Sequence, residues 1–107
     1  MESAYVLRID TESNKYDALN AVLGVKPTST DYWWEVEIKD SREGLHYLLQ
    51  LIEVNFSELQ NVGLDKGAIS IWYYYEFDEQ CNMEFDSDDL KRMGECGITL
   101  CISCWNG

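Results

Sequence analysis

The sequence predicts an α+β fold, a two-layer sandwich in which a sheet of about four to five strands carries helices on one face. Two segments, residues 31–40 and 68–77, alternate apolar and polar side chains as half-buried strands do. Between them, residues 45–59 repeat leucine, isoleucine and phenylalanine at helical spacing. Strands and helices therefore alternate, and we expect a single domain, residues 1–107, that is ferredoxin-like or a variant of that fold.

The amino-terminal part of the chain predicts a strand and then a helix. Residues 4–10 form a short run of β-branched and aromatic side chains, which is typical of a strand. Asn14, followed three residues later by Asp17, resembles a capping box, so we expect the helix to begin there. Gly24 ends this helix in our interpretation, and the only proline of the chain follows shortly after it.

The central part predicts one long helix between two strands. Asp40 and Glu43 form a second capping box, and the apolar stripe after them continues until Gly63, so we expect one helix over this span. In the strand at 68–77, the apolar face is expected to contact the helices. The opposite face carries Ser70, Trp72, Tyr74 and Glu76.

The carboxyl-terminal part predicts a helix followed by a last strand. Residues 82–85 have the pattern of a short returning strand. Residues 86–97 predict a helix that has Asp86 as its N-cap. Residues 98–105 predict the last strand, with three apolar side chains facing inward, namely Ile98, Leu100 and Ile102.

The composition restricts the class of function. The chain has 107 residues and a formal net charge of −12, from 20 acidic and 8 basic side chains. Such a charge repels nucleic acid and anionic lipid and attracts basic partners, so we expect no nucleic-acid or membrane partner. The sequence lacks a signal-peptide pattern and an apolar run of membrane-spanning length, which predicts a cytoplasmic protein. Its four cysteines are then expected to be reduced thiols.

The acid-rich stretch, residues 76–89, does not fit a metal site. It holds seven carboxylates and no basic residue. A calcium loop needs glycine at its sixth position and glutamate at its twelfth, but counting from Asp86 those positions hold Lys91 and Gly97. We therefore expect no metal or other cofactor.

The cysteines and the histidine do not predict catalysis. Cys96, Cys101 and Cys104 have the spacing of some iron–sulfur ferredoxins, but they fall on or beside an expected strand. Side chains three residues apart on a strand point to opposite faces, so these thiols do not converge on one metal. His46 is the only histidine and is expected to be an ordinary residue of the long helix. We predict no catalytic residue, and an enzyme is the third-ranked class.

The candidate site combines acidic and aromatic side chains. The expected open face of the sheet carries an aromatic platform that consists of Trp33, Trp72, Tyr74 and Trp105. The acids beside it, around the turn after residue 77, are Glu76, Asp78, Glu79 and Glu84. Two interpretations stay open for each group. The acids either solvate a turn or face a partner, and the aromatic residues either close a second small core or form a binding surface.

Several local sequences resemble those of a bacterial family known as domain of unknown function 4279. They are the opening strand, "LGVKPT" at residues 23–28, the pair Trp33-Trp34, and "MEFDSDDLKRMGECGITLCI" at residues 83–102. The resemblance covers most of the chain, apart from a shorter loop before Tyr32, and implies the fold described above. It offers no established catalytic residues to carry over and leaves the function open.

Two functions fit these observations. The first is a non-catalytic acidic protein that binds a basic protein partner, in its concrete form a bacterial immunity-type protein that neutralises a toxin. The second is a small-molecule binding or sensor domain that takes a cationic or aromatic molecule on the open face. Either protein would be a monomer or a homodimer.

Overall fold

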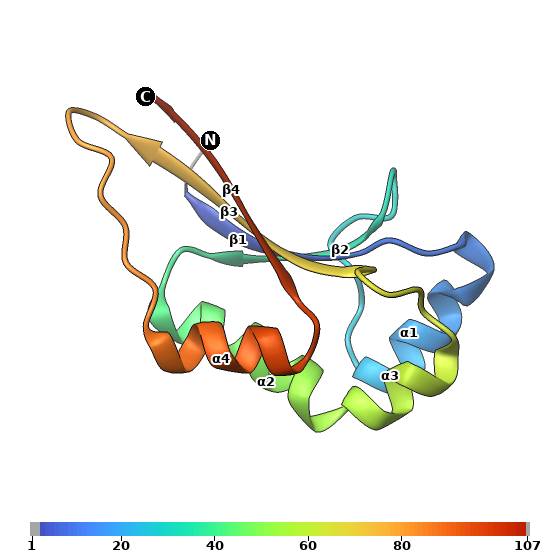
Figure 1. Ribbon diagram of the computed structural model, residues 1–107. Coiled ribbons are helices and arrows are strands. Elements are labelled where there is room, and N and C mark those ends of the chain that lie inside the picture. The colour runs from blue at the N-terminus through green and yellow to red at the C-terminus, as the bar shows by residue number, and fades with distance from the viewer. Residues whose placement is uncertain (1–2, 107) are drawn as a thin grey trace.

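Four strands form one mixed sheet, and helices pack against one of its faces (Figure 1). The computed structural model describes residues 3–106, and its sheet has the order β2-β1-β3-β4. The strands are β1 (Ala4–Ile9), β2 (Trp34–Lys39), β3 (Ile69–Phe77) and β4 (Thr99–Asn106). This architecture confirms the predicted two-layer α+β sandwich.

The strand pairing makes this fold a variant of the ferredoxin-like type. β1 is antiparallel to both of its neighbours, β2 and β3, whereas β3 and β4 are parallel. Parallel neighbours need a crossover connection, and α4 (Ser87–Glu95) supplies it. The ferredoxin-like order β-α-β-β-α-β joins its middle strands directly, while helices separate each pair of consecutive strands here.

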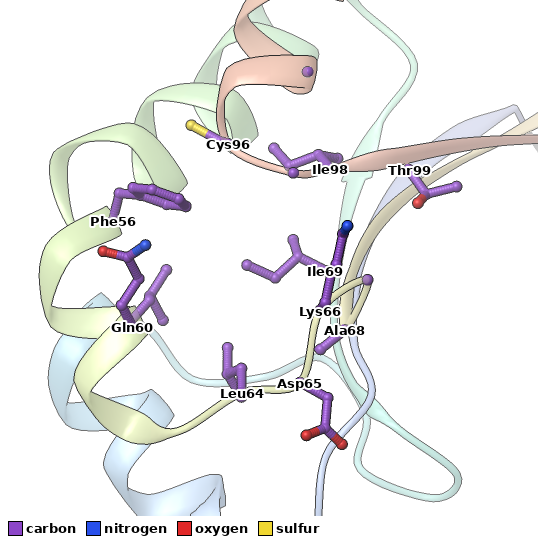
Figure 2. A pocket seen from close by; sticks show the side chains of 14 residues that line it. Phe56, Gln60, Leu64, Asp65, Lys66, Ala68, Ile69, Cys96, Ile98 and Thr99 are labelled. Carbon is purple, nitrogen blue, oxygen red and sulfur yellow. The ribbon is translucent and has the colours of Figure 1, made fainter.

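The other helices lie on the same side of the sheet as α4. They are η1 (Ser13–Lys15), α1 (Tyr16–Leu23), α2 (Arg42–Val54) and α3 (Phe56–Val62). In Figure 1 these helices lie beneath the sheet, and the upper face of the sheet is open. A pocket lies between α3, the start of β3 and the turn from α4 into β4 (Figure 2).

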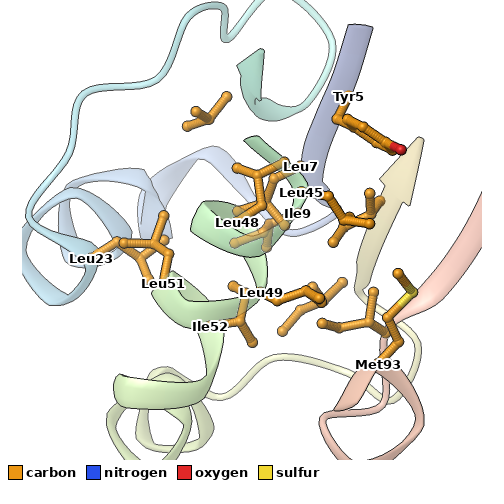
Figure 3. Close-up of a cluster of buried hydrophobic side chains, with 14 of the residues drawn as sticks. Tyr5, Leu7, Ile9, Leu23, Leu45, Leu48, Leu49, Leu51, Ile52 and Met93 are labelled. Carbon is orange, nitrogen blue, oxygen red and sulfur yellow. The ribbon is translucent and has the colours of Figure 1, made fainter. Parts of the chain in front are cut away.

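The hydrophobic core fills the space between the sheet and the helices (Figure 3). Leu7 of β1, Leu48 of α2 and Ile71 of β3 are fully buried there. Trp34 is also fully buried, and its indole Nε1 donates to Asn20 Oδ1 of α1 at 2.8 Å. Each large apolar side chain buried in this way contributes about 1.5–3 kcal/mol, so this layer holds the helices against the sheet.

The two edges of the sheet differ. At β2, the backbone of Ser29 forms an isolated bridge with Glu35, which covers part of that edge. At β4, no strand pairs with the outer edge within residues 3–106. Ile102 is the register partner of Tyr73 and faces the helices, as predicted. Its side chain remains 46% exposed because it lies at this open edge.

The predicted long helix is wrong, because the chain forms two helices that meet at Asn55. The Asn55 side-chain Nδ2 donates to the carbonyl of Leu51 at 2.8 Å, a bond that competes with the regular helical pattern. The Asn55 backbone, at φ −111° and ψ 10°, departs from the helix at the same point. The change of direction lets α3 pack against α1, with Leu59 buried between them and the sheet.

Two predicted helix starts are also wrong. The N-cap of α2 is Ser41, whose Oγ accepts from the backbone N–H of Gly44 at 2.9 Å. Asp40 has another partner, since its Oδ2 accepts from the Tyr73 hydroxyl at 3.0 Å. At the first helix, a 3₁₀ turn precedes α1, and Lys15 occupies the N-cap without a side-chain bond.

The segment before α4 is held by apolar side chains and not by the predicted strand. Residues 82–85 have no strand pairing. Met83 and Phe85 pack against the core, and the Phe85 ring meets the Tyr73 ring edge-on at 5.8 Å between centroids. Asp86 is the N-cap of α4 as predicted, but its side chain makes no capping bond and contacts Arg42 of α2 instead.

Candidate functional site

The centre of the open face is occupied by an arginine that lies between two tryptophans. Arg8 projects from β1, a central strand of the sheet. Its guanidinium carbon is 4.0 Å from the centroid of the Trp33 ring and 4.4 Å from that of the Trp72 ring. Both distances are typical of cation–π contacts, which are strongest where water is excluded.

Hydrogen bonds fix the orientation of this guanidinium. Arg8 Nε donates to Glu35 Oε1 at 2.9 Å, and Arg8 Nη2 donates to the Tyr74 hydroxyl oxygen at 3.0 Å. Arg8 and Glu35 are direct partners in the β1–β2 register, and the side chain of Arg8 is only 12% exposed. We call this group of Arg8, Trp33, Glu35, Trp72 and Tyr74 the Arg8 cage.

The Arg8 cage shows that most of the predicted aromatic platform contacts a side chain of the protein itself. The structure brings together Trp33, Trp72 and Tyr74, as expected of one face, but they surround a cation that belongs to the protein. One face of the Trp33 ring and one face of the Trp72 ring are already in contact with Arg8. This arrangement disfavours a small cationic ligand at this position, because the ligand would have to displace an arginine from its carboxylate.

The fourth predicted aromatic residue, Trp105, lies further along the open face. It is the register partner of Glu76, two residues beyond Tyr74 on β3. The Tyr74 ring is stacked on Trp72, with centroids 6.0 Å apart and planes at 17°. The open face therefore runs from the Arg8 cage through Tyr74 to the half-buried Trp105 and the exposed Glu76.

The predicted acids lie at the end of β3 and in the segment that follows. Glu76, Asp78, Glu79 and Glu84 are all exposed. Figure 1 shows β3 projecting past the helices, with the turn after it at one end of the molecule. Glu84 lies between Met83 and Phe85, whose packing against the core holds the returning segment in place. No ion pair involves any of these four acids within residues 3–106.

The basic residues are distributed differently. The four arginine and lysine side chains that form ion pairs with carboxylates in the described part of the chain are Arg8, Arg42, Lys91 and Arg92. The Lys15 ammonium donates to the carbonyl of Gly63 at 2.7 Å. Half of the 8 basic side chains thus pair with carboxylates other than Glu76, Asp78, Glu79 and Glu84.

His46 has a structural partner. Its Nε2 lies 3.0 Å from Oδ1 of Asp89, a buried carboxylate at 5% exposure, and so links α2 to α4. Further along the same helix pair, Arg92 donates to both carboxylate oxygens of Glu53, at 2.6 and 2.9 Å. The hydrogen bond from Arg92 lowers the pKa of Glu53. These contacts dock α4 onto α2, so they explain His46 without a catalytic role.

Two tyrosines near this helix pair are held in their neutral form. Burial, followed by the nearby Asp40 and Asp89 carboxylates, raises the pKa of Tyr5 to about 12. Burial and the hydrogen bond to Asp40 raise the pKa of Tyr73 above its ordinary value. The two rings are stacked, with centroids 4.5 Å apart. Both hydroxyls therefore act as neutral groups within the fold, and not as proton acceptors.

The cysteines of the last strand point to opposite sides. Cys101 is the register partner of Trp72, on the open face, whereas Cys104 is the partner of Tyr75, on the helix side. Cys96 lies before the strand, where burial, followed by the Glu53 and Glu95 carboxylates, raises the pKa of its thiol. Within residues 3–106, no group of three or more potential ligands is arranged to hold a metal ion.

The fold and this face define a small α+β domain with an acidic, aromatic sheet surface. Comparisons with known protein families, curated proteins and solved structures found no match, so the resemblance to domain of unknown function 4279 stays a prediction. Among the described residues, no helix has the length and apolar character needed to cross a membrane.

Proposed function

We propose that this chain is a non-catalytic binding protein that docks a basic protein partner on the open face, at the end that carries the acids. In its concrete form it is an immunity-type protein that neutralises a basic toxin. The observation that carries this proposal is a group of four exposed acids that form no ion pair within residues 3–106, namely Glu76, Asp78, Glu79 and Glu84. The first of them, Glu76, is the register partner of Trp105.

The Arg8 cage favours a protein partner over a small cation. Because Arg8 already lies over one face of Trp33 and one face of Trp72, the space between these two rings is filled by a cation of the protein itself. What remains available is an extended surface with Tyr74 and Trp105 on it and carboxylates at its end. Tyrosine and tryptophan are frequent anchors of protein interfaces, and peripheral charges steer the approach of an oppositely charged partner.

The acidic residues and Trp105 have separate roles in this proposal. The acids act over a distance and raise the rate of association, an effect that salt weakens. Trp105 makes short-range contact and slows dissociation, since buried aromatic side chains dominate binding energy. The protein needs no catalytic group for either role.

The test compares the natural chain with two variants of equal charge. In the patch variant, Glu76→Gln, Asp78→Asn, Glu79→Gln and Glu84→Gln remove the proposed docking charges. In the control, the same number of exposed acids is neutralised elsewhere by Glu12→Gln, Asp17→Asn, Glu43→Gln and Glu58→Gln. Each protein serves as bait in copurification from the native host, followed by mass spectrometry and by binding kinetics with the purified partner.

We expect the natural chain and the control to retain the same basic protein and the patch variant to lose it. Association with that protein should slow roughly tenfold in the patch variant and depend less on salt. Trp105→Ala should leave the association rate nearly unchanged and raise the dissociation rate. Equal binding by the patch variant and the control would show that these four positions have no special role, and the proposed docking surface would be wrong.

A further inference from the structure

A second concave site lies on the helix side of the molecule, away from the open face. It is a pocket of about 500 Å³ between α3, the start of β3 and the turn from α4 into β4 (Figure 2). Its walls are mostly apolar, formed by Phe56, Leu59, Leu64, Ile69 and Ile98. This volume lies within the range of roughly 300–1,000 Å³ that is usual for small-molecule sites.

One residue that lines this pocket is a helix glycine. Gly94 lies inside α4, and its backbone is not in the left-handed region. A Cβ added there would meet nothing within 4 Å, so packing does not require glycine at this position. The pocket's other glycines, Gly67 and Gly97, have φ of +83° and +66°, which explains them by backbone conformation. Glycine weakens the helix relative to alanine at this position, so Gly94 is a lining residue that can be replaced without a steric clash.

The polar groups around the pocket indicate an uncharged ligand. The rim carries one residue of each charge, Asp65 and Lys66, so the charged side chains of the rim sum to zero. Gln60 and Thr99 are the neutral side chains on the rim that can donate or accept a hydrogen bond. The Cys96 thiol has a raised pKa because it is partly buried and near acids, and it is therefore a neutral part of the wall. The net charge of −12 also disfavours an anionic ligand.

We propose that this pocket binds a neutral, mainly apolar small molecule, aromatic or with a short alkyl chain, that carries one hydrogen-bonding group. The apolar walls contact the body of the ligand, and Gln60 or Thr99 contacts its polar group. The site is separate from the docking face of the proposed function and does not depend on it.

The test is a fluorescence titration of the purified chain with N-phenyl-1-naphthylamine, a neutral aromatic probe whose emission increases in apolar surroundings. The natural chain should bind one probe molecule saturably. Gly94→Leu, which places a side chain in the open space, should weaken binding at least roughly tenfold. The matched control Gly94→Ala should bind with an unchanged dissociation constant and unfold at higher urea concentration, because alanine favours the helix.

A second blocking variant and two competitors make the test independent of one substitution. Gln60→Trp narrows the pocket from α3 and should weaken binding as Gly94→Leu does, even if the leucine variant fails to fold. The neutral alcohol 1-decanol should displace the probe, whereas decanoate should displace it at least roughly tenfold less effectively. A decanoate that competes as well as the alcohol would overturn the proposed ligand class.

The position of the probe can be read by NMR. Probe binding should shift the methyl signals of Leu59, Ile69 and Ile98 and leave the indole signals of Trp72 and Trp105 on the open face unchanged. The proposal is overturned if the natural chain shows no saturable binding, if a folded blocking variant binds as tightly as the natural chain, or if the indole signals shift in place of the methyl signals.

Discussion

Replacing Arg8 by methionine is the sharpest test of the Arg8 cage. Methionine retains an unbranched apolar side chain between Trp33 and Trp72. It removes the cation over both rings, the ion pair to Glu35 and the hydrogen bond to the Tyr74 hydroxyl. The expected effect is therefore a loss of stability that comes mainly from charge and hydrogen bonding, and not from a cavity.

The expected loss of stability in Arg8→Met follows from the cation–π contacts of Arg8 and from the burial of its ion pair with Glu35. Each cation–π contact in a partly desolvated layer contributes about 1 kcal/mol. Breaking the ion pair costs more than the ~1 kcal/mol of a surface pair and less than the ~3–5 kcal/mol of a buried one, because the side-chain exposures are 12% for Arg8 and 22% for Glu35. Because these contributions overlap, we expect the free energy of unfolding to fall by about 3 kcal/mol.

The assay is urea unfolding, followed in parallel by circular dichroism and by tryptophan emission. The native-state emission of Arg8→Met should differ from that of the natural chain, since Trp33 and Trp72 lose the cation from their ring faces. The double variant Arg8→Met, Glu35→Gln should recover about 1 kcal/mol, because it also removes the carboxylate left without a partner. Arg8→Lys should be intermediate, since an ammonium lacks the planar fork that reaches both partners.

Two results would refute this reasoning. A loss below about 1 kcal/mol for Arg8→Met would mean that the pair behaves as an ordinary surface contact. A double variant no more stable than Arg8→Met would mean that Glu35 is well solvated without its arginine. In either case the open face would again be available to an external cation.

Three further predictions concern stability. Folded Tyr5 retains a proton that the unfolded chain releases near pH ~10, so Tyr5 should lower the free energy of unfolding by up to about 3 kcal/mol between pH ~10 and ~12. Urea melts of Tyr5→Phe should lack this part of the fall and keep the part that comes from the raised pKa of Tyr73. Trp72→Ala should cost about 3 kcal/mol and Trp105→Ala under ~1 kcal/mol in the same melts, since only Trp72 packs in the Arg8 cage; equal losses would contradict this division. Asp89→Ala should cost about 2 kcal/mol, because it leaves the partners of a buried carboxylate unpaired. Asp86→Ala should cost under ~1 kcal/mol, because Asp86 belongs to an exposed ion pair. The reverse order would mean that Asp89 does not hold α4 against α2.

The strands and their faces could be predicted because alternation is a local property of the sequence. The run around Trp34 and the run around Ile71 each place apolar side chains on one side, and both residues are fully buried. The Arg8 cage could not be predicted in this way. It depends on strand pairing between distant segments, since Glu35 and Tyr74 are 27 and 66 residues from Arg8. The outward position of Arg8 in the first strand was the one available signal.

The helix ends show where local patterns compete. Asp40 and Ser41 are both good N-cap residues, and Asp40 is needed by the Tyr73 hydroxyl, a contact that only the folded chain creates. At Asn55 the apolar stripe continues without interruption, so sequence spacing predicted one helix. The one local signal is Asn55, whose side chain bonds the Leu51 carbonyl, but an asparagine alone does not specify a break; the packing of α3 against α1 favours it as well. The pocket beside α3 was not predicted either, because it is formed by segments that are distant in the sequence.

The open edge at β4 gives the high net charge a further consequence. Natural sheets usually protect an edge strand with lysine, proline or a bulge, but residues 96–107 contain no charged residue and no proline. Protection against edge-to-edge association therefore falls to the repulsion between whole molecules of charge −12. Because salt screens that repulsion, the colloidal stability of this protein should decrease as ionic strength rises.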